Sequence, residues 1–243
     1  MAILEGHNLT MRFGGLVALK NVTFTITSNE LVALLGPNGS GKTTLFDLIS
    51  GHLTPSEGTI RFHGETITGR SPHRIARLGL GRTYQIPRPF PALTVRDNVA
   101  VGALFRGASH SPTRILAQRE AEKFLEIVGL PDKAGALAST LSLGDLKRLE
   151  LALALATRPA LLLLDELAAG LSPRGREEVI SLYGKLRARG LTIVAIEHDF
   201  RTLTRVADRI LVLDQGALIA DGPPEVVLTS RRVAEAYLGE NDT

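Results

Sequence analysis

The sequence predicts an α/β fold in which a helix-covered parallel sheet is joined to an N-terminal antiparallel β subdomain and interrupted by an inserted helical subdomain. Two short runs rich in β-branched residues open the chain at 2–13 and 18–27, with polar and glycine breaks between them, which is typical of an antiparallel sheet. From residue 31 onward, compact apolar runs alternate with helical stretches, a pattern that indicates parallel strands covered by helices.

The elements of the alternating region follow from their periodicity and length. Short continuous apolar runs are expected to be buried strands, and longer amphipathic stretches are expected to be helices. The expected strands are 31–36, 191–197 and 209–214, and the expected helices are 42–50 and 174–189. In the middle third, "TVRDNVAVGALF" and "TRILAQREAEKFLEIVGL" have helical patterns with no strand-like run between them. We therefore expect a core with the β subdomain formed by 1–86 and 158–243, and a helical subdomain formed by 87–157.

The composition favours a globular protein and argues against several other classes. Of 243 residues, 44% are apolar, while 28 basic and 25 acidic residues leave a net charge of only +3. So small a charge gives no reason to expect a nucleic-acid partner. The absence of cysteine excludes disulfides and thiolate metal sites. The N-terminus lacks the apolar region of a secretory signal, and charged residues and a proline interrupt the most apolar segment, 149–171. We expect a cytosolic protein without a membrane-spanning helix.

A phosphate-binding loop follows the expected strand 31–36. The segment "GPNGSGKTT" matches G-x-x-x-x-G-K-[ST] and opens the next expected helix, which makes the alternative of a glycine-rich turn that binds nothing the weaker one. The glycines let the backbone fold around an anion, and the helix that begins near Lys42 adds the positive end of its dipole. Lys42 is expected to reach the β- and γ-phosphates, and Thr43 to bind Mg²⁺. The predicted nucleotide-binding residues of the loop are Gly36, Pro37, Asn38, Gly39, Ser40, Gly41, Lys42, Thr43 and Thr44.

A second motif, "LLLLDE", supplies a metal anchor and a candidate base. Four leucines suit a buried parallel strand whose end presents Asp165 to the Mg²⁺ shell. Glu166, the next residue, is expected to orient and partly deprotonate an attacking water. A strand that ends in a helix-capping acid has the same pattern, so the catalytic interpretation depends on the presence of the phosphate-binding loop.

Together these residues resemble the ATP-binding subunits of ABC transporters, and the resemblance covers nearly the whole chain from Phe13 onward. Besides the two motifs above, "TYQIPRPF" has Gln85 at the position of the Q-loop, "LSLGD" stands at the signature, "AAGLSP" at the D-loop, and "IEHD" has His198 at the position of the switch histidine. The resemblance implies a P-loop NTPase with a RecA-like core, which binds ATP and Mg²⁺ and couples ATP hydrolysis to transport.

The resemblance also implies that the signature segment acts on a partner. In this family two subunits enclose two nucleotides, and the signature helix of one contacts the γ-phosphate held by the P-loop of the other. Ser142 would donate its hydroxyl and Gly144 its backbone N–H, while the helix running on from Asp145 would add its dipole. Ser142 and Asp145 also match an ordinary capping box, and both interpretations can hold together. Leu143 and Asp145 depart from the usual LSGGQ, and an acid near a triphosphate should oppose its binding.

Three further residues take their expected roles from the resemblance. His198 would hydrogen-bond the γ-phosphate and hold the attacking water with Glu166; standing alone, it would be interpreted as an ordinary histidine at a strand end. Gln85 would contact Mg²⁺ or water and sense the γ-phosphate, with an ordinary polar strand end as the alternative. Phe13 would stack on adenine, and a core side chain is the equally weighted alternative.

Within the family, "RFGGLVALKNV", "GRTYQIPRPFPALTV" and "EAYLGE" are most similar to LivG-type subunits of branched-chain amino-acid importers. This similarity implies a homo- or heterodimer with a second ATPase subunit, permease subunits that dock near Gln85 and 87–94, an indirect periplasmic solute-binding partner and peripheral attachment to the cytoplasmic face of the membrane. Urea import, lipopolysaccharide export and a switch without useful hydrolysis stay open as alternatives, and a nucleic-acid-binding role is the weakest. Leu167 and Ser172 depart from the usual proline and aspartate, which leaves the coupling between subunits open.

Overall fold

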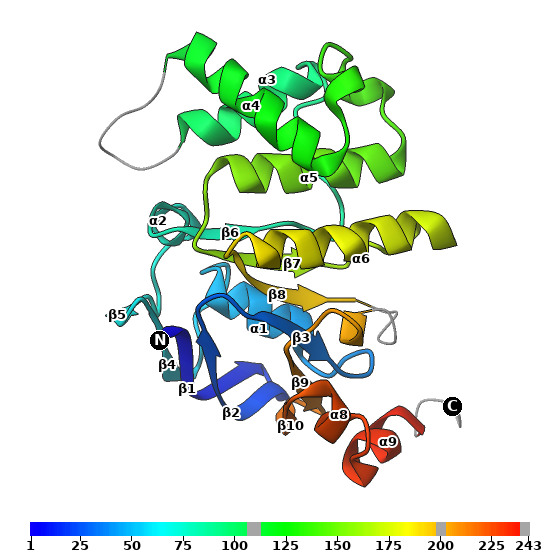
Figure 1. Cartoon of the computed structure of the whole chain (residues 1–243). Helices are drawn as coiled ribbons and strands as arrows, with labels where there is room; N and C mark the ends of the chain where they lie inside the picture. Colours follow the sequence, from blue (N-terminus) through cyan, green and yellow to red (C-terminus); the bar gives the residue numbers. More distant parts are fainter. Residues whose placement is uncertain (106–112, 198–202, 239–243) are drawn as a thin grey trace.

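The computed structural model describes residues 1–105, 113–197 and 203–238, which form two β-sheets and the helices around them (Figure 1). The first sheet is antiparallel and has the strand order β2-β1-β4-β5. Its strands are β1 (Ala2–Phe13), β2 (Leu16–Thr27), β4 (Glu57–Phe62) and β5 (Glu65–Thr66). β1 and β2 are joined by a turn of two glycines, of which Gly14 has a φ of 58°. The predicted antiparallel subdomain is confirmed, and β2 begins two residues earlier than expected.

The second sheet has the order β10-β9-β3-β8-β7-β6, and its neighbouring strands are parallel except for β9 and β10. The strands are β3 (Leu31–Leu35), β6 (Leu80–Arg82), β7 (Leu161–Asp165), β8 (Thr192–Ile196), β9 (Arg209–Asp214) and β10 (Ala217–Gly222). The strands expected at 31–36, 191–197 and 209–214 are confirmed. The carboxyl ends of β3, β7 and β8 lie at one edge of this sheet, which is where ligands bind in open α/β sheets.

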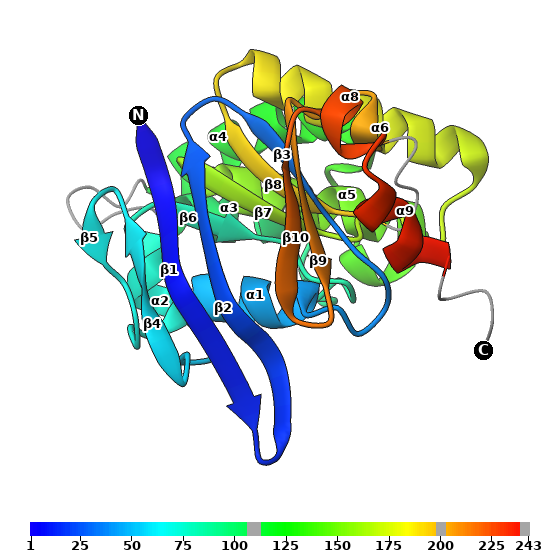
Figure 2. The ribbon, with the colours of Figure 1, turned by 90° about the horizontal axis from the view of Figure 1, so that it is seen from below.

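The central strands are buried on both faces because different helices cover each face. Alternate residues of β3 enter different cores: Leu31, Ala33 and Leu35 pack with residues of α6 (Pro173–Ala188), whereas Val32 and Leu34 pack with residues of α1 (Lys42–Ile49). Figure 2 shows α1 on one side of these strands and α6 on the other. Burial on both faces explains why β3 and β7 have continuous rather than alternating apolar sequences.

The middle third of the chain forms a group of helices that lies away from the antiparallel sheet (Figure 1). Its helices are α3 (Val95–Leu104), α4 (Arg114–Val128) and α5 (Leu143–Ala156). Their N-cap residues are Thr94, Thr113 and Ser142, each of which accepts a backbone N–H with its side chain. α3 and α5 approach closely, because a Cβ at Gly102 would lie 2.5 Å from the Leu153 carbonyl oxygen.

Three further α-helices are α2 (Pro72–Arg77), α8 (Pro224–Val227) and α9 (Arg231–Leu238), and two short 3-10 helices lie at Pro131–Lys133 and Ala138–Thr140. Helix α9 lies against the phosphate-binding loop, since the Gly36 N–H donates a 2.8 Å hydrogen bond to the Tyr237 hydroxyl. A contact between the C-terminal helix and this loop was not expected from the sequence. In the part of the chain that the structure describes, none of the helices has the length and apolar character needed to cross a membrane.

Candidate functional site

The phosphate-binding loop connects the end of β3 to the start of α1, as the sequence predicts. Gly41 is the N-cap of α1 and has a φ of 104°, and Gly36 has a φ of 148°. Both positions also lack space for a side chain, because a Cβ would lie 2.0 Å from the Leu213 carbonyl oxygen at Gly36 and 2.7 Å from the Ala18 carbonyl oxygen at Gly41. The loop therefore requires glycine at these positions, and it leads into the unpaired N–H groups of a helix N-terminus.

Lys42 and Ser40 present polar groups of the loop that a phosphate could satisfy. The Lys42 ammonium donates hydrogen bonds of 2.7 and 2.8 Å to the carbonyl oxygens of Gly36 and Pro37. The Ser40 hydroxyl is buried and has no hydrogen-bond partner among the described residues. A phosphate group would supply stronger, charge-assisted acceptors for the ammonium than the two carbonyls do.

A cavity of about 480 Å³ lies over this loop. Its lining includes Phe13 at the end of β1, the loop residues 38–44 and Glu166. This volume falls within the usual range for cofactor and ligand sites, roughly 300–1,000 Å³. Phe13 is 45% exposed, so its interpretation as a core side chain is wrong. Its ring is free to stack on a base, and that role stays a prediction.

Asp165 ends β7, which β8 separates from β3 in the sheet, and it is buried. One guanidinium nitrogen of Arg82 lies 3.3 Å from the Asp165 carboxylate, and the other lies 2.6 Å from the Asp47 carboxylate. Burial raises the pKa of Asp165, and the positive charge of Arg82 opposes this shift. Sequence reasoning missed Arg82, whose place is set by the pairing of β6 with β7.

The described residues contain no cluster of three or more His, Cys, Asp or Glu side chains that could hold a metal ion by themselves. Asp165 and the Thr43 hydroxyl nevertheless offer the hard oxygen ligands that Mg²⁺ prefers. Magnesium commonly takes only one or two protein ligands and completes its shell with water and nucleotide phosphates. The predicted ligands therefore fit a metal that arrives with a nucleotide better than a permanent metal centre.

Gln85 and Glu166, which stand far apart in the sequence, meet at the edge of the cavity. The Gln85 side-chain amide donates a 2.7 Å hydrogen bond to the Glu166 carboxylate. Glu166 has a φ of 50°, an uncommon conformation for a residue with a side chain, and its backbone N–H donates to the Ile196 carbonyl oxygen at 2.9 Å. His198, the third predicted catalytic residue, lies outside the described residues.

The Ser142 segment starts helix α5. The helix begins at Leu143 rather than at Asp145 as expected, because Ser142 is the N-cap and accepts the Asp145 N–H at 3.3 Å. The Ser142 hydroxyl donates to the Asp145 carboxylate at 2.7 Å, and Lys133 also pairs with this carboxylate. The N-cap half of the predicted capping box is thus confirmed, whereas the Asp145 carboxylate accepts from the Ser142 hydroxyl and not from its backbone N–H. None of the residues that line the cavity belongs to 142–145, so the segment is not part of this cavity.

The two residues that depart from the expected proline and aspartate have structural roles. Ser172 is the N-cap of α6, since its hydroxyl oxygen accepts the Gly175 N–H at 3.2 Å. Leu167, which directly follows Glu166, is buried in the core.

A group of buried charged residues next to Glu166 was not foreseen from the sequence. Lys147, Glu150 and Glu197 are all almost fully buried. One Glu150 oxygen accepts the Tyr84 N–H at 2.7 Å, while the other has no hydrogen-bond partner among the described residues. Burial raises the pKa of Glu150 to about 7. The sequence shows that Glu150 stands between apolar residues of a helix. It does not show which side chains of other elements surround the carboxyl group.

Glu150→Gln should change how stability depends on pH. A carboxyl whose folded-state pKa is raised from 4.5 to about 7 stabilises the fold fully only below pH 4.5, and this contribution is lost as the pH rises towards 7. The difference in the free energy of unfolding, Glu150→Gln minus wild type, should therefore increase between pH 5 and pH 8, by at most about 3 kcal/mol. Urea unfolding followed by circular dichroism measures this difference, with the exposed Glu177→Gln as control. A difference that is the same at both pH values would contradict the assignment.

Comparisons with known proteins agree with this geometry. The family described as "ABC transporter" matches residues 19–169, and the one described as "Branched-chain amino acid ATP-binding cassette transporter" matches residues 217–243. The chain is 40% identical over 250 residues to the high-affinity branched-chain amino acid transport ATP-binding proteins BraF of Pseudomonas aeruginosa and LivG of Escherichia coli K12, covering 98% of each chain. A solved nucleotide-free ATP-binding cassette from an ABC transporter matches with a TM-score of 0.88 and 30% identity, over 98% of this chain and 99% of that one. A dimeric cassette bound to ADP and phosphate matches with a TM-score of 0.82 and 26% identity, over 91% and 99%.

Proposed function

Because this chain belongs to the ATP-binding subunits of ABC transporters, we propose that it hydrolyses ATP to power an importer of branched-chain amino acids. ATP hydrolysis coupled to transport is the general function of this family. The observation that carries the proposal at the level of chemistry is the hydrogen bond between Gln85 and Glu166 beside the cavity of the phosphate-binding loop. This bond supports the proposal because it joins a candidate base, which lines the cavity, to a candidate sensor of the γ-phosphate.

The residues of this chain would share the work of hydrolysis as follows. The loop N–H groups and Lys42 bind the phosphates, and Phe13 stacks on the adenine. Glu166 accepts a proton from the attacking water and orients it in line with the γ-phosphate, while Gln85 and His198 hold the water and the phosphate oxygens. Asp165 and Thr43 would hold Mg²⁺, which when bound neutralises charge on the β- and γ-phosphates.

A second cassette would complete the site. Ser142 and Gly144 lie at the start of α5, outside the pocket of their own chain, and the donors at a helix N-terminus suit the γ-phosphate held by a partner. The dimeric cassettes among the similar structures support this arrangement. The partner could be a second copy of this chain or a different ATPase subunit. Closure on ATP would require the Ser142 hydroxyl to exchange the Asp145 carboxylate for a phosphate oxygen.

Asp145→Gln should strengthen this closure. Partial burial opposes ionisation of Asp145, but hydrogen bonds from Lys133 and Ser142 outweigh it and lower its pKa, so the residue is negatively charged at neutral pH. The pairing with Lys133 offsets part of the repulsion between this charge and a triphosphate. The ATP concentration for half-maximal hydrolysis should fall by about two- to threefold at low salt, and less at high salt. An ATPase titration of the assembled complex measures it, and no shift at low salt would contradict the repulsion.

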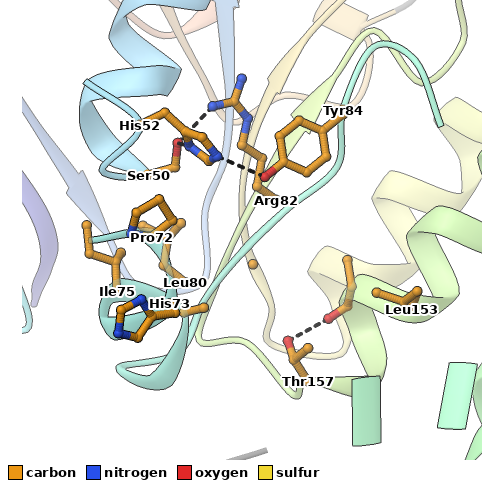
Figure 3. A pocket seen from close by; sticks show the side chains of 13 residues that line it. Ser50, His52, Pro72, His73, Ile75, Leu80, Arg82, Tyr84, Leu153 and Thr157 are labelled. Atoms are coloured by element: carbon orange, nitrogen blue, oxygen red, sulfur yellow. Dashed lines mark hydrogen bonds between the residues drawn. The ribbon is translucent and has the colours of Figure 1, made fainter. Parts of the chain in front are cut away.

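The permease would contact the face around the Q-loop. A cavity of about 270 Å³ lies between the end of α1, α2, β6 and α5 (Figure 3). The Tyr84 hydroxyl lies 3.2 Å from a ring nitrogen of His52 at its wall, and Ile86, just beyond Tyr84, is 73% exposed. An apolar hollow with an exposed apolar residue beside it suits a short cytoplasmic helix of a membrane subunit. We place the docking site here, next to the predicted position at 87–94.

The solute, the location and the domain division are also proposals. The match of the C-terminal residues 217–243 and the names of the relatives support branched-chain amino acids over urea import or lipopolysaccharide export. The chain would attach peripherally to the cytoplasmic face of the membrane through its permeases, which would receive solute from a periplasmic binding protein. Residues 87–157 would form a helical subdomain, and residues 1–86 and 158–243 would form the core with the β subdomain.

Reconstitution tests this function. The chain, its permeases and the solute-binding protein are assembled in liposomes, and ATP-dependent uptake of labelled leucine, isoleucine and valine is measured beside that of urea. Uptake of the branched-chain amino acids is expected, together with ATP hydrolysis that they stimulate. Uptake of urea alone would contradict the proposed solute and keep the transport role. A complex that binds ATP but neither hydrolyses it nor transports would instead support a binding switch.

A further inference from the structure

We propose that Lys147 is a positioning residue for ATP hydrolysis, which ties the catalytic segment 166–169 to helix α5 and so links the two nucleotide sites that one subunit serves. This inference rests on the proposed function, because it assigns Lys147 a task through Glu166. Lys147 is not among the residues that line the cavity over the phosphate-binding loop.

Lys147 reaches the catalytic segment through two backbone contacts. Its side chain is buried, with a total exposure of 4% for the residue. The ammonium donates hydrogen bonds of 2.9 Å to the Glu166 carbonyl oxygen and 2.5 Å to the Ala169 carbonyl oxygen. A buried ammonium is costly unless it is paired and hydrogen-bonded, so these contacts are specific features of the fold rather than an incidental surface interaction.

Acidic residues around Lys147 favour its charged form. Burial lowers the pKa of Lys147, and the negative charges of Glu197, Glu166 and Glu150 oppose this shift. Glu197 holds the same segment from another side, since its carboxylate accepts the Ala168 N–H at 3.0 Å and the Tyr183 hydroxyl at 2.6 Å. Lys147 therefore holds the segment at two carbonyl groups, and Glu197 holds it at one N–H.

The backbone of Glu166 explains why such support is needed. A residue with a side chain at a φ of 50° is strained by about 1–3 kcal/mol, and the conformation persists only where the surroundings impose it. The N–H of Glu166 is held by Ile196 and its carbonyl by Lys147, so the peptide groups on both sides of the residue are fixed. From this backbone the Glu166 side chain reaches Gln85, whose amide donates to the carboxylate.

The position of Lys147 on α5 gives the contact a second consequence. Ser142, the N-cap of the same helix, is the residue proposed to bind the partner's nucleotide, and Lys147 is less than two helical turns further along. A shift of α5 when the partner's ATP is bound would move the Lys147 ammonium and, with it, the carbonyl of Glu166. One subunit would in this way couple the position of its own base to its contact with the ATP of its partner.

The test compares the steady-state kinetics of transporter complexes that carry single substitutions. Lys147→Met keeps the length and apolar stem of the side chain and removes the donors, so kcat is expected to fall about 10- to 100-fold through misplacement of Glu166. The KM for ATP should change less than about threefold, because the phosphate-binding loop is untouched. Lys147→Arg keeps the donors and should recover most of the loss. Arg158→Met, which removes the surface ion pair with Glu120, is the matched control and should leave kcat unchanged.

A double variant separates positioning from a loss of stability. In the Glu166→Gln background, Lys147→Met should lower the residual kcat by less than about threefold, since a residue that acts through Glu166 has little left to position. A full additive loss in this background, or a rise in KM equal to the fall in kcat, would overturn the proposal. Thermal unfolding of the nucleotide-free variants checks that each is folded. Should Lys147→Met fail to fold, Lys147→Gln carries the same comparisons, and unchanged kcat in it would equally overturn the proposal.

The same measurements distinguish a failure of the proposed function from a failure of the role of Lys147. If the wild-type complex hydrolyses ATP and Glu166→Gln abolishes the activity while Lys147→Met retains it, the proposed function stands and the role of Lys147 is wrong. If the wild-type complex does not hydrolyse ATP, both are wrong.

Discussion

Glu166→Gln is expected to lower the turnover of ATP by about 10²- to 10⁴-fold, the usual contribution of a general base, while ATP binding is retained. The substitution keeps the size of the side chain and the acceptor for the Gln85 amide, and it leaves the phosphate-binding loop unchanged. Because hydrolysis would then be slow, the ATP-bound dimer should accumulate. Single-turnover hydrolysis, nucleotide binding and sedimentation of the variant with its membrane partners measure the three effects.

Glu177→Gln on the exposed face of α6 is the matched control, since it removes one carboxylate far from any predicted catalytic role. It should leave turnover within about twofold of wild type, as most surface substitutions do. If the Glu166→Gln variant hydrolyses ATP at the wild-type rate, another group must activate the water. A variant saturated with MgATP that stays monomeric would contradict the proposed sharing of nucleotide between two subunits.

Lys42→Met is expected to weaken ATP binding by at least about 30-fold, because a charge-assisted contact with phosphate contributes roughly 2–3 kcal/mol. The structure adds a second reason for a large effect. The Lys42 ammonium bridges the carbonyl oxygens of Gly36 and Pro37, so its loss also removes two hydrogen bonds that shape the loop before ATP arrives. Equilibrium binding of ATP and of ADP to the isolated subunit measures the loss, and hydrolysis should fall below detection.

Lys42→Met should affect the binding of ATP and of ADP to different extents. Lys42 is expected to reach both the β- and the γ-phosphate, so ATP should lose more affinity than ADP. Lys185→Met, at an exposed position of α6, is the control for the loss of a cation. This variant should bind both nucleotides as wild type does. Retention of wild-type ATP affinity in Lys42→Met would contradict the assignment of the loop, whereas retained binding with lost hydrolysis would limit the role of Lys42 to the chemical step.

The outcomes at Phe13 and Ser142 show where pattern alone was insufficient. The strand end at Phe13 fits a core residue and a nucleotide-stacking residue equally well, and only the open lining of the cavity decides against the core. At Ser142 the local pattern was sufficient for the cap, because a capping box involves residues three positions apart. It was insufficient for Lys133, whose pairing with Asp145 requires the packing of the helical region.

The sequence by itself determined the elements and the motifs whose geometry is local. The glycines of the phosphate-binding loop, the apolar strand before Asp165 and the helix caps each depend on neighbours within a few residues, so residue type and spacing are enough to predict them. Only the tertiary structure decided the partners of these residues. Arg82 meets Asp165 because β6 pairs with β7, and Lys147 meets Glu166 because the first part of α5 lies against the segment that follows β7. Such contacts join residues distant in the chain, and their identity depends on strand order and helix packing, which no short sequence window contains.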